Sequence, residues 1–240
     1  MKRLILIFVI LTSLISCEKL QRNDEKAYAV VTDKDIASIK VFNEKDDMTD
    51  KYEYSYNEAG AIISVDHNGT HYAYYYDNTQ LVGITCSSYA FSRVLTYDER
   101  NHLVAYSVYK DGKFVVKYAL DYENDRISCF NILTKEDSHI AETSMPYVWK
   151  ESNLHSIGNM NFTYNEILNN FNVPIPELSF PSHGLILDPL FAGFGISQHM
   201  IHTSQTSSLS EYSYLRNSEG DITRINVNNG KLYYIIEYID

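Results

Sequence analysis

A tyrosine-rich repeat runs through residues 52–130 and limits the folds that this chain can adopt. Each unit consists of an aromatic residue, a polar turn of four or five residues and an aliphatic residue. The units read YNEAGAI at 56–62, YDNTQL at 76–81, YDERNHL at 97–103, YENDRI at 122–127 and WKESNL at 149–154. On either side of these turns, aromatic and aliphatic residues recur at every second position, which is the period of a β-strand. The repeat therefore predicts strands that are joined by short turns.

The turns between the strands indicate that the sheet is antiparallel. They include Asn57–Gly60, Asp66–Gly69, Lys110–Gly112 and Asn228–Gly230. Glycine and asparagine adopt the positive φ angles that tight hairpins require. The chain shows no long segment of helical periodicity, and strands that are joined by hairpins run antiparallel.

The spacing of the repeat sets the size of its unit. From Tyr56 to Trp149 the aromatic anchors lie 20, 21, 25 and 27 residues apart, which is enough for two strands and two turns. The pattern returns at residues 217–225, which match residues 57–65 position by position, with Arg216 in place of the anchoring tyrosine. The same supersecondary unit is therefore expected to recur along most of the chain.

These features predict an all-β protein with a minor α contribution. Residues 28–240 are expected to form a single β-repeat domain, a large curved antiparallel β-meander that resembles an open barrel. The repeat alone leaves open whether the ends of the sheet meet. A proline-rich insert at residues 165–208 is expected to cover one face or one open end of the sheet.

The insert contains four of the five prolines, a residue type that is excluded from central strands. Asp188 and Pro189 have the pattern of a helix N-cap followed by proline at the first helical position. An apolar run follows them, so a short helix is expected near residues 188–196. The apolar content of the insert argues against the alternative of a disordered loop.

The N-terminal residues have the features of an export signal. A short basic head precedes an apolar run at residues 4–15, which is shorter than the roughly 20 residues that span a bilayer. The run leads into LISC, which resembles the lipobox of bacterial lipoproteins and ends at Cys17. We therefore expect residues 1–16 to be a lipoprotein signal peptide, Cys17 to be lipidated and residues 17–27 to form a flexible tether. The alternative is an ordinary signal peptide with an incidental cysteine.

The charge of the chain narrows the choice of partners. Removal of residues 1–16 takes two of the 20 basic residues, so 18 remain against 31 acidic ones and the net charge becomes 18 − 31 = −13. An acidic surface repels phosphate groups, so nucleic acid is not an expected partner and the membrane is expected to be reached through the lipid on Cys17. We expect the protein in the bacterial cell envelope, at the outer membrane. A membrane-spanning barrel is not expected, because segments such as residues 126–131 lack a uniformly apolar face.

Two further cysteines, Cys86 and Cys129, are expected to be free and mostly buried thiols. In an up-and-down sheet three other strands would lie between the strands that carry these cysteines. At about 4.8 Å per strand, the two strands would then be about 19 Å apart. A disulfide needs Cα atoms that lie about 6 Å apart. Only a sheet that rolls up would bring these two cysteines together.

The units Tyr-Asp-x-x-x-x-Leu and Tyr-Asn-Glu-Ala-Gly-x-Ile resemble the YD repeats of RHS-type proteins. Together with the lipobox and the proline-rich insert, they are similar to a family of Bacteroidetes lipoproteins of unknown function. That resemblance covers roughly residues 35–240 and implies a porin-like fold, an antiparallel sheet curled toward a barrel. It implies no catalytic residues. The chain departs from true YD repeats in spacing and in lacking glycine at residues 78–80, so a closed RHS-type shell is not expected from so few repeats.

His199 and His202 are the metal-binding candidates that the sequence offers. Their i, i+3 spacing would place both imidazoles on one face of a helix, with His183 and Asp188 as further ligands. The alternative is two solvated residues on the rim of the insert. The chain has no Gly-x-Ser-x-Gly elbow and no phosphate-binding glycine loop. We therefore expect no cofactor and no enzymatic activity, and keep a metal-dependent enzyme centred on these histidines as the alternative.

The 21 tyrosines suggest a recognition function. Tyrosine provides a large, rigid and amphipathic contact area and is enriched at binding surfaces. Most of the tyrosines are expected to form the core. Tyr75, Tyr106 and Tyr234 are expected on the opposite face of the sheet, where they would bind a glycan or a protein. The expected function is a non-enzymatic binding or structural module of the cell envelope.

Overall fold

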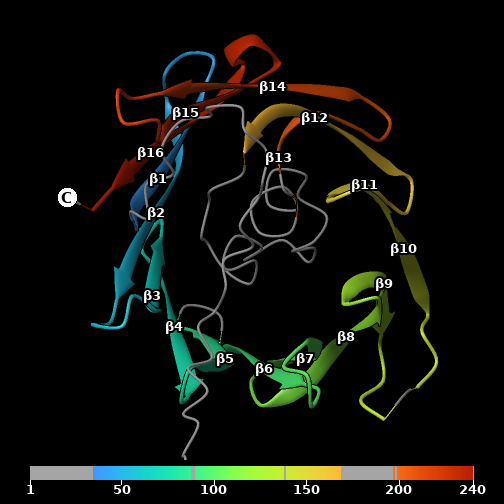
Figure 1. Cartoon of the computed structure of the whole chain (residues 1–240). Coiled ribbons are helices and arrows are strands. Elements are labelled where there is room, and N and C mark those ends of the chain that lie inside the picture. The colour runs from blue at the N-terminus through green and yellow to red at the C-terminus, as the bar shows by residue number, and fades with distance from the viewer. Residues whose placement is uncertain (1–34, 88–89, 138, 169–196, 198, 240) are drawn as a thin grey trace, which may run out of the picture.

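The computed structural model describes residues 35–87, 90–137, 139–168, 197 and 199–239. These residues form one closed antiparallel barrel in which each strand pairs with its neighbours in sequence and the first strand pairs with the last (Figure 1). The strands are β1 (Ile36–Asn43), β2 (Met48–Tyr56), β3 (Ile62–His67), β4 (Thr70–Asp77), β5 (Gln80–Cys86), β6 (Phe91–Tyr97), β7 (Leu103–Lys110), β8 (Lys113–Glu123), β9 (Arg126–Leu133), β10 (Thr143–Lys150), β11 (Asn153–Ile157), β12 (Met160–Leu168), β13 (His199–Gln205), β14 (Leu209–Arg216), β15 (Ile222–Val227) and β16 (Leu232–Tyr238). A single turn of 3₁₀-helix, η2 (Asn228–Gly230), precedes β16.

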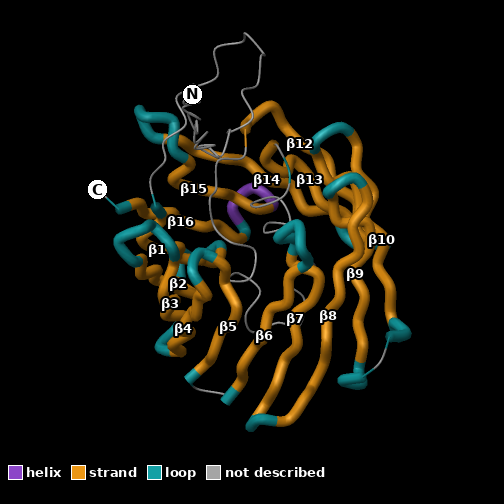
Figure 2. Tube along the Cα trace, turned by 60° about the horizontal axis from the view of Figure 1, so that its bottom comes forward, coloured by secondary structure: helices purple, strands orange, loops and turns teal. Residues whose placement is uncertain are grey.

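The predicted all-β antiparallel meander is confirmed, and the sheet also closes completely. In β16, Tyr238 pairs with Ile36 of β1, and this pairing continues to Leu232 and Asn43. Figure 2 shows the middle of the meander, β5 to β9, side by side along the wall of the barrel. The sequence left open whether the ends of the sheet meet, and the described residues show that they do, in a closed barrel of sixteen strands.

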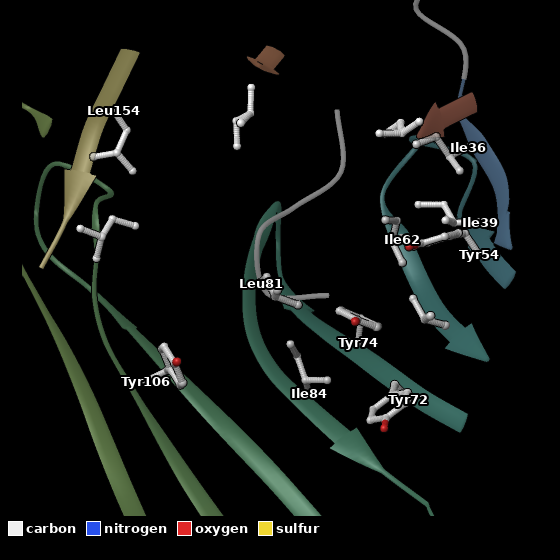
Figure 3. Close-up of a cluster of buried hydrophobic side chains, with 14 of the residues drawn as sticks. Ile36, Ile39, Tyr54, Ile62, Tyr72, Tyr74, Leu81, Ile84, Tyr106 and Leu154 are labelled. Atoms are coloured by element: carbon white, nitrogen blue, oxygen red, sulfur yellow. The ribbon is translucent and has the colours of Figure 1, made fainter. Parts of the chain in front are cut away.

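The two walls of the barrel differ in composition. The inner wall carries the apolar face of each strand, and Ile84, Leu154, Phe130 and Ile225 on four different strands are fully buried. Figure 3 shows side chains of this wall, which come from strands far apart in sequence and face the interior. Burial of such faces is the main favourable contribution to the stability of a fold of this kind.

Each repeat unit places its anchor opposite its aliphatic residue, next to a shift in register. The pairs are Tyr56–Ile62, Tyr76–Leu81, Tyr97–Leu103, Tyr122–Ile127, Trp149–Leu154, Tyr164–Ile201, Arg216–Ile222 and Tyr238–Ile36. An irregularity of this type bends a strand and increases its twist. Repeated around the sheet, it supplies the curvature that a barrel needs.

The anchors also link each unit to the preceding one. Their polar atoms donate hydrogen bonds to backbone carbonyl groups of the neighbouring unit, and we call this set the tyrosine belt. The bonds are Tyr56 to Ile36 (2.7 Å), Tyr76 to Ile62 (2.8 Å), Tyr97 to Leu81 (2.7 Å), Tyr122 to Leu103 (3.1 Å), Trp149 to Ile127 (2.7 Å), Tyr164 to Leu154 (2.5 Å), Tyr214 to Ile201 (2.5 Å) and Tyr238 to Ile222 (2.8 Å). Tyr214 donates in place of Arg216, which occupies the anchor position of its unit but has no hydroxyl group.

The polar residue after the anchor organises the turn. Asn57 accepts hydrogen bonds at its Oδ1 atom from the backbone N–H groups of Ala59 and Ala61, both at 2.9 Å. Asp98 and Asn217 make the same pair of contacts in their own turns. Gly60 in the first of these turns has a φ of 76°, a conformation that glycine adopts without strain. The Tyr-Asn and Tyr-Asp dipeptides of the repeat are thus a belt residue followed by a turn cap.

Several predictions concern residues outside the described ranges. These are the signal peptide at 1–16, Cys17, the tether at 17–27 and the helix near 188–196. At the two ends of the 165–208 insert, strands β12 and β13 continue to Leu168 and begin at His199, so the interruption of the barrel is narrower than the sequence suggested. No helix in the described part of the chain has the length and apolar character needed to cross a membrane.

Cys86 and Cys129 are free, as predicted. Cys86 is buried on β5, whereas Cys129 is half-buried on β9, and three strands separate them. Burial raises the pKa of the Cys129 thiol, and the nearby Asp121 carboxylate adds to this effect. The closed barrel therefore keeps the two thiols apart, although it rolls up the sheet that carries them.

Candidate functional site

Arg93 is a charged residue on the apolar inner wall of the barrel. Its strand pairs it with Ile84 on one side and with Val108 on the other. The guanidinium carbon lies 5.7 Å from the centre of the Tyr106 ring, within the range of a cation–π contact. Burial lowers the pKa of Arg93, and the hydroxyl groups of Tyr106 and Tyr74 oppose this shift.

The Tyr106 ring continues as an aromatic ladder across the next two strands. It stacks on Tyr118 with ring centres 4.6 Å apart, and Tyr118 stacks on Phe130 at 5.2 Å. Burial raises the pKa of Tyr106 and of Tyr118, because an ionised phenol would lose its hydration. Tyr106, Tyr118 and Phe130 are at most 6 % exposed, so the cluster is closed to solvent and stabilises the wall rather than presenting a binding surface.

The sequence does contain a signal that Arg93 faces the interior, although it lies outside the repeat motif itself. In β6, Phe91, Arg93, Leu95 and Tyr97 occupy alternate positions, so the arginine is in phase with three core residues. A charged residue at an apolar phase of a strand is an unusual feature and indicates either a paired charge or a special environment. The aromatic neighbours that surround it come from other strands and cannot be identified from local sequence.

The three tyrosines predicted for a binding face do not lie on the same wall. Tyr75 of β4 is 52 % exposed on the outer wall. Tyr106 is buried on the inner wall, where it pairs with Leu95 and Tyr118. Tyr234 is half-buried against the core. The expectation that they share one outward face is therefore wrong for Tyr106 and Tyr234.

A register shift explains the misplacement of Tyr106. In the pairing of β6 with β7, Tyr97 faces Leu103 but Thr96 faces Ala105, so Val104 is passed over. This shift changes the phase of the strand, and counting by twos from Leu103 assigns Tyr106 to the wrong wall.

Tyr75 belongs to a row of residues that crosses four strands of the outer wall. Tyr75 pairs with Gly83, and Gly83 pairs with Val94. On β3, the pairing with β2 passes over Ile63, which lies next to Ser64, the partner of Ala73 on β4; Ile63 does not pair into the row but is exposed beside it. We call Ile63, Tyr75, Gly83 and Val94 the Tyr75 platform. Its three large side chains are 42 %, 52 % and 49 % exposed, respectively.

Most neighbours of the platform are small or hydroxylated. Ser64, Ala73, Thr85 and Ser92 lie on one side, Thr96 and Ala105 lie on the other, and Ser107 continues the row beside Val94. The charged neighbour is Asp77, which lies two residues beyond Tyr75 on the same face of β4 and pairs with Gln80. The Thr85 hydroxyl donates to the Tyr75 hydroxyl at 3.4 Å. A β-carbon on Gly83 would lie 3.9 Å from two atoms of Tyr75, so the ring leans across the glycine.

The two histidine candidates do not share a helical face, and the further ligands expected with them, His183 and Asp188, lie outside the described residues. Both lie on strand β13, and a strand does not bring residues i and i+3 onto one face as a helix does. The His199 ring nitrogen Nδ1 lies 3.1 Å from the Asn153 side-chain amide, whereas His202 is exposed. Among the described residues, no group of three or more His, Cys, Asp or Glu side chains could hold a metal ion. The helical geometry that motivated the prediction is therefore wrong.

Asp98 and His102 form one of the Asp–His pairs of the described residues, beside His67 with Asp50 (2.9 Å) and His71 with Asp66 (3.0 Å). Asp98 Oδ2 lies 3.2 Å from His102 Nδ1, and the imidazole stacks on Tyr122 with ring centres 4.5 Å apart. The backbone N–H of His102 holds the pKa of the Asp98 carboxyl below its usual value. Asp98 caps the turn that contains both residues, and this structural role accounts for its contacts.

Comparison with known proteins yields fold likenesses only. No family model matches the chain, and no curated protein matches it either. A porin-like protein from Bacteroides uniformis is similar, with a TM-score of 0.45 and 14 % identity over 88 % of this chain and 99 % of the other. A porin-like protein from Bacteroides vulgatus has a TM-score of 0.42 and 11 % identity, over 86 % of this chain and 99 % of the other.

Proposed function

We propose that the chain is a lipid-anchored protein of the bacterial cell envelope, attached through Cys17 at the outer membrane. Its barrel stands in water and acts as a non-enzymatic binding module. The partner, a glycan or a protein, binds the outer wall at the Tyr75 platform. The lipobox-like LISC sequence supports the lipid anchor. The difference in polarity between the inner and outer walls supports a barrel that stands in water.

The observation that carries this proposal is the polarity of the barrel. A membrane-spanning barrel presents an apolar band to lipid and keeps its interior polar. Here the inner wall is apolar, whereas the outer wall carries charges within its strands. Lys40 and Glu237 form an ion pair at 2.5 Å across β1 and β16, and Lys51 and Glu53 form another on β2 at 2.6 Å. A basic residue facing lipid at mid-membrane costs about 2–4 kcal/mol, so this wall favours water.

The platform is the part of the outer wall best suited to binding. Exposed tyrosine contributes contact area at low entropic cost because it has few rotatable bonds. Tyr75 is also held in place by Gly83 beneath it and Thr85 beside it. A preorganised aromatic residue on a rigid sheet loses little freedom when a partner binds.

The proposal is tested with a form that comprises residues 18–240. All sixteen strands lie between Ile36 and Tyr238, so this form keeps the whole barrel. We expect it to remain monomeric and monodisperse in buffer without detergent, and to produce no conductance steps in planar bilayers. Aggregation that only detergent relieves, or stepwise conductance, would show that the barrel spans membranes.

The anchor is tested separately with full-length protein in cells. Wild-type protein should incorporate labelled fatty acid and enter the detergent-rich phase on phase separation. Cys17→Ser should do neither, while the matched change Cys86→Ser, at a buried barrel thiol, should leave labelling intact. Equal labelling of Cys17→Ser and wild type would disprove lipidation at this residue.

A further inference from the structure

We infer that the Tyr75 platform binds uncharged glycans, with the tyrosine ring stacked against the face of a sugar ring. This inference rests on the proposed function and specifies its ligand. It is carried by the exposure of the ring, the absence of a basic residue in the rows beside it across β3 to β7, and the hydroxyl groups that border it.

The geometry of the platform suits a flat ligand. A pyranose ring presents C–H groups on one face and hydroxyl groups around its edge, so it can lie on an aromatic ring and donate and accept hydrogen bonds sideways. Gly83, next to Tyr75 on the neighbouring strand, has no side chain that would stand above the sheet. Ala73 and Thr85, on the adjacent row, are short, so space beside the ring stays open.

The charge of the platform selects against ionic ligands. The chain has a net charge of −11, and Asp77 adds a negative charge two residues beyond Tyr75 on the same strand, whereas the platform and the rows beside it carry no basic residue across β3 to β7. An anionic polysaccharide would be repelled by Asp77 and by the rest of the acidic surface. A neutral glycan avoids this cost.

The composition of the platform favours a sugar over a protein. Protein interfaces concentrate Trp, Tyr, Met and Arg at their centre and are depleted in Ser and Ala, and they bury about 800 Å² on each partner. The platform has one aromatic ring and two aliphatic side chains, and Ser, Thr and Ala surround them. Such a surface is poor in anchors for a protein but rich in hydroxyl groups for a carbohydrate.

The test is calorimetric titration of the 18–240 form with neutral hexose oligosaccharides (cellohexaose, maltohexaose and mannohexaose) and with a charged oligogalacturonate. We expect at least one neutral oligosaccharide to bind and the galacturonate not to bind. Tyr75→Thr, which keeps high strand propensity, should weaken binding roughly ten-fold, and Tyr75→Phe should stay within about three-fold of wild type. Val148→Thr is the control: it introduces the same residue, threonine, at a 48 % exposed position on β10 and should change nothing.

Unchanged binding by Tyr75→Thr, preference for the galacturonate, or no binding of any neutral oligosaccharide would overturn the inference. A photo-reactive phenylalanine analogue at position 75, introduced in living cells, then distinguishes a failure of the glycan inference from a failure of the proposed binding function. A specific crosslink to a protein contradicts the glycan inference but leaves the binding module in place. Absence of both a crosslink and sugar binding contradicts the inference and the proposed function together.

Discussion

At the scale of single residues, the tyrosine belt explains why the repeat needs an aromatic residue with a polar tip. A shift in register leaves a backbone group without its ladder partner. A buried unpaired carbonyl is costly, and the belt hydroxyls supply donors to the carbonyl groups of Ile62, Leu81 and Leu103, which lie at such shifts. Trp149 meets the same need with its indole N–H, which shows that the donor matters rather than the phenol itself.

Replacement of Tyr76 by phenylalanine should therefore destabilise the barrel without changing its shape. The loss of one buried hydrogen bond costs about 1 kcal/mol, which lowers the Tm of a domain of this size by about 2–4 °C. Differential scanning calorimetry of the 18–240 form measures this. Tyr75→Phe, at the adjacent exposed position, is the control and should shift the Tm by less than about 1 °C, since surface changes have small effects. Equal shifts for the two variants would contradict a role for the belt hydroxyl.

The belt tyrosines also predict the behaviour of the protein in alkali. Burial raises the pKa of Tyr164 to about 12 and raises that of Tyr214 and Tyr238 as well. Because these folded-state values lie above that of an unfolded tyrosine, about 10, their contribution to stability is complete below pH 10 and falls as the pH rises above it. Absorbance at 295 nm should show a cooperative late group of tyrosines that ionises together with the loss of the far-UV signal. Gradual ionisation of all the tyrosines near pH 10 with the fold intact would contradict this account.

At the scale of elements, the seam between β1 and β16 is held by side-chain contacts on the outer wall. On the outer wall, Glu237 accepts hydrogen bonds from Lys40 at 2.5 Å and from Ser38 at 2.6 Å. Phe42 stacks on Tyr233, with ring centres 5.0 Å apart, and Arg224 of β15 lies over the same Tyr233 ring. These contacts join the two ends of the chain in the way that turns join the other strands.

Glu237 makes the seam sensitive to acid. The hydrogen bond from Lys40, followed by that from Ser38, lowers the pKa of this carboxyl. Its contribution is therefore present above the pKa of an unfolded glutamate, about 4.3, and is lost as the pH falls through the lower folded value. Glu237→Gln should lower the Tm at pH 7 by more than it does at pH 3, where part of the contribution of the glutamate has been lost. Glu211→Gln, on β14, serves as the control, and a pH-independent difference for Glu237→Gln would contradict the argument.

The strands themselves were predictable from alternation and turn residues. Which residues of a strand face the core was not always predictable. The period of two placed Tyr54, Tyr72 and Tyr118 in the core, where the structure has them. It failed at Tyr106 because the shift at Val104 changes the phase within one strand. Register depends on the partner strand, so local sequence does not reveal such a shift.

At the scale of the whole molecule, two of the repeat units are divided in the sequence, and one of these two closes the barrel. The insert separates Tyr164 from Ile201, although the two pair directly. The two ends of the chain separate Tyr238 from Ile36, and this unit closes the barrel. Neither unit is recognisable as a contiguous repeat, which is why the sequence left open whether the ends of the sheet meet. The exposed Tyr75 was predictable because it follows the simple alternation of its own strand. Arg93 follows the alternation of β6 as well, but the aromatic residues that surround it come from other strands, so its environment could not be predicted from local sequence.

The barrel is closed, and we propose that it stands in water. Amide hydrogen exchange of the 18–240 form in detergent-free buffer tests this most directly. The amides of β1 and β16 should be as strongly protected as those of β7 and β8 in the middle of the meander, and all should exchange through global unfolding. A form that ends at Gly230 and lacks β16 provides the open reference. Exchange of β1 and β16 within minutes, as at the edges of an open sheet, while β7 and β8 stay protected, would contradict closure.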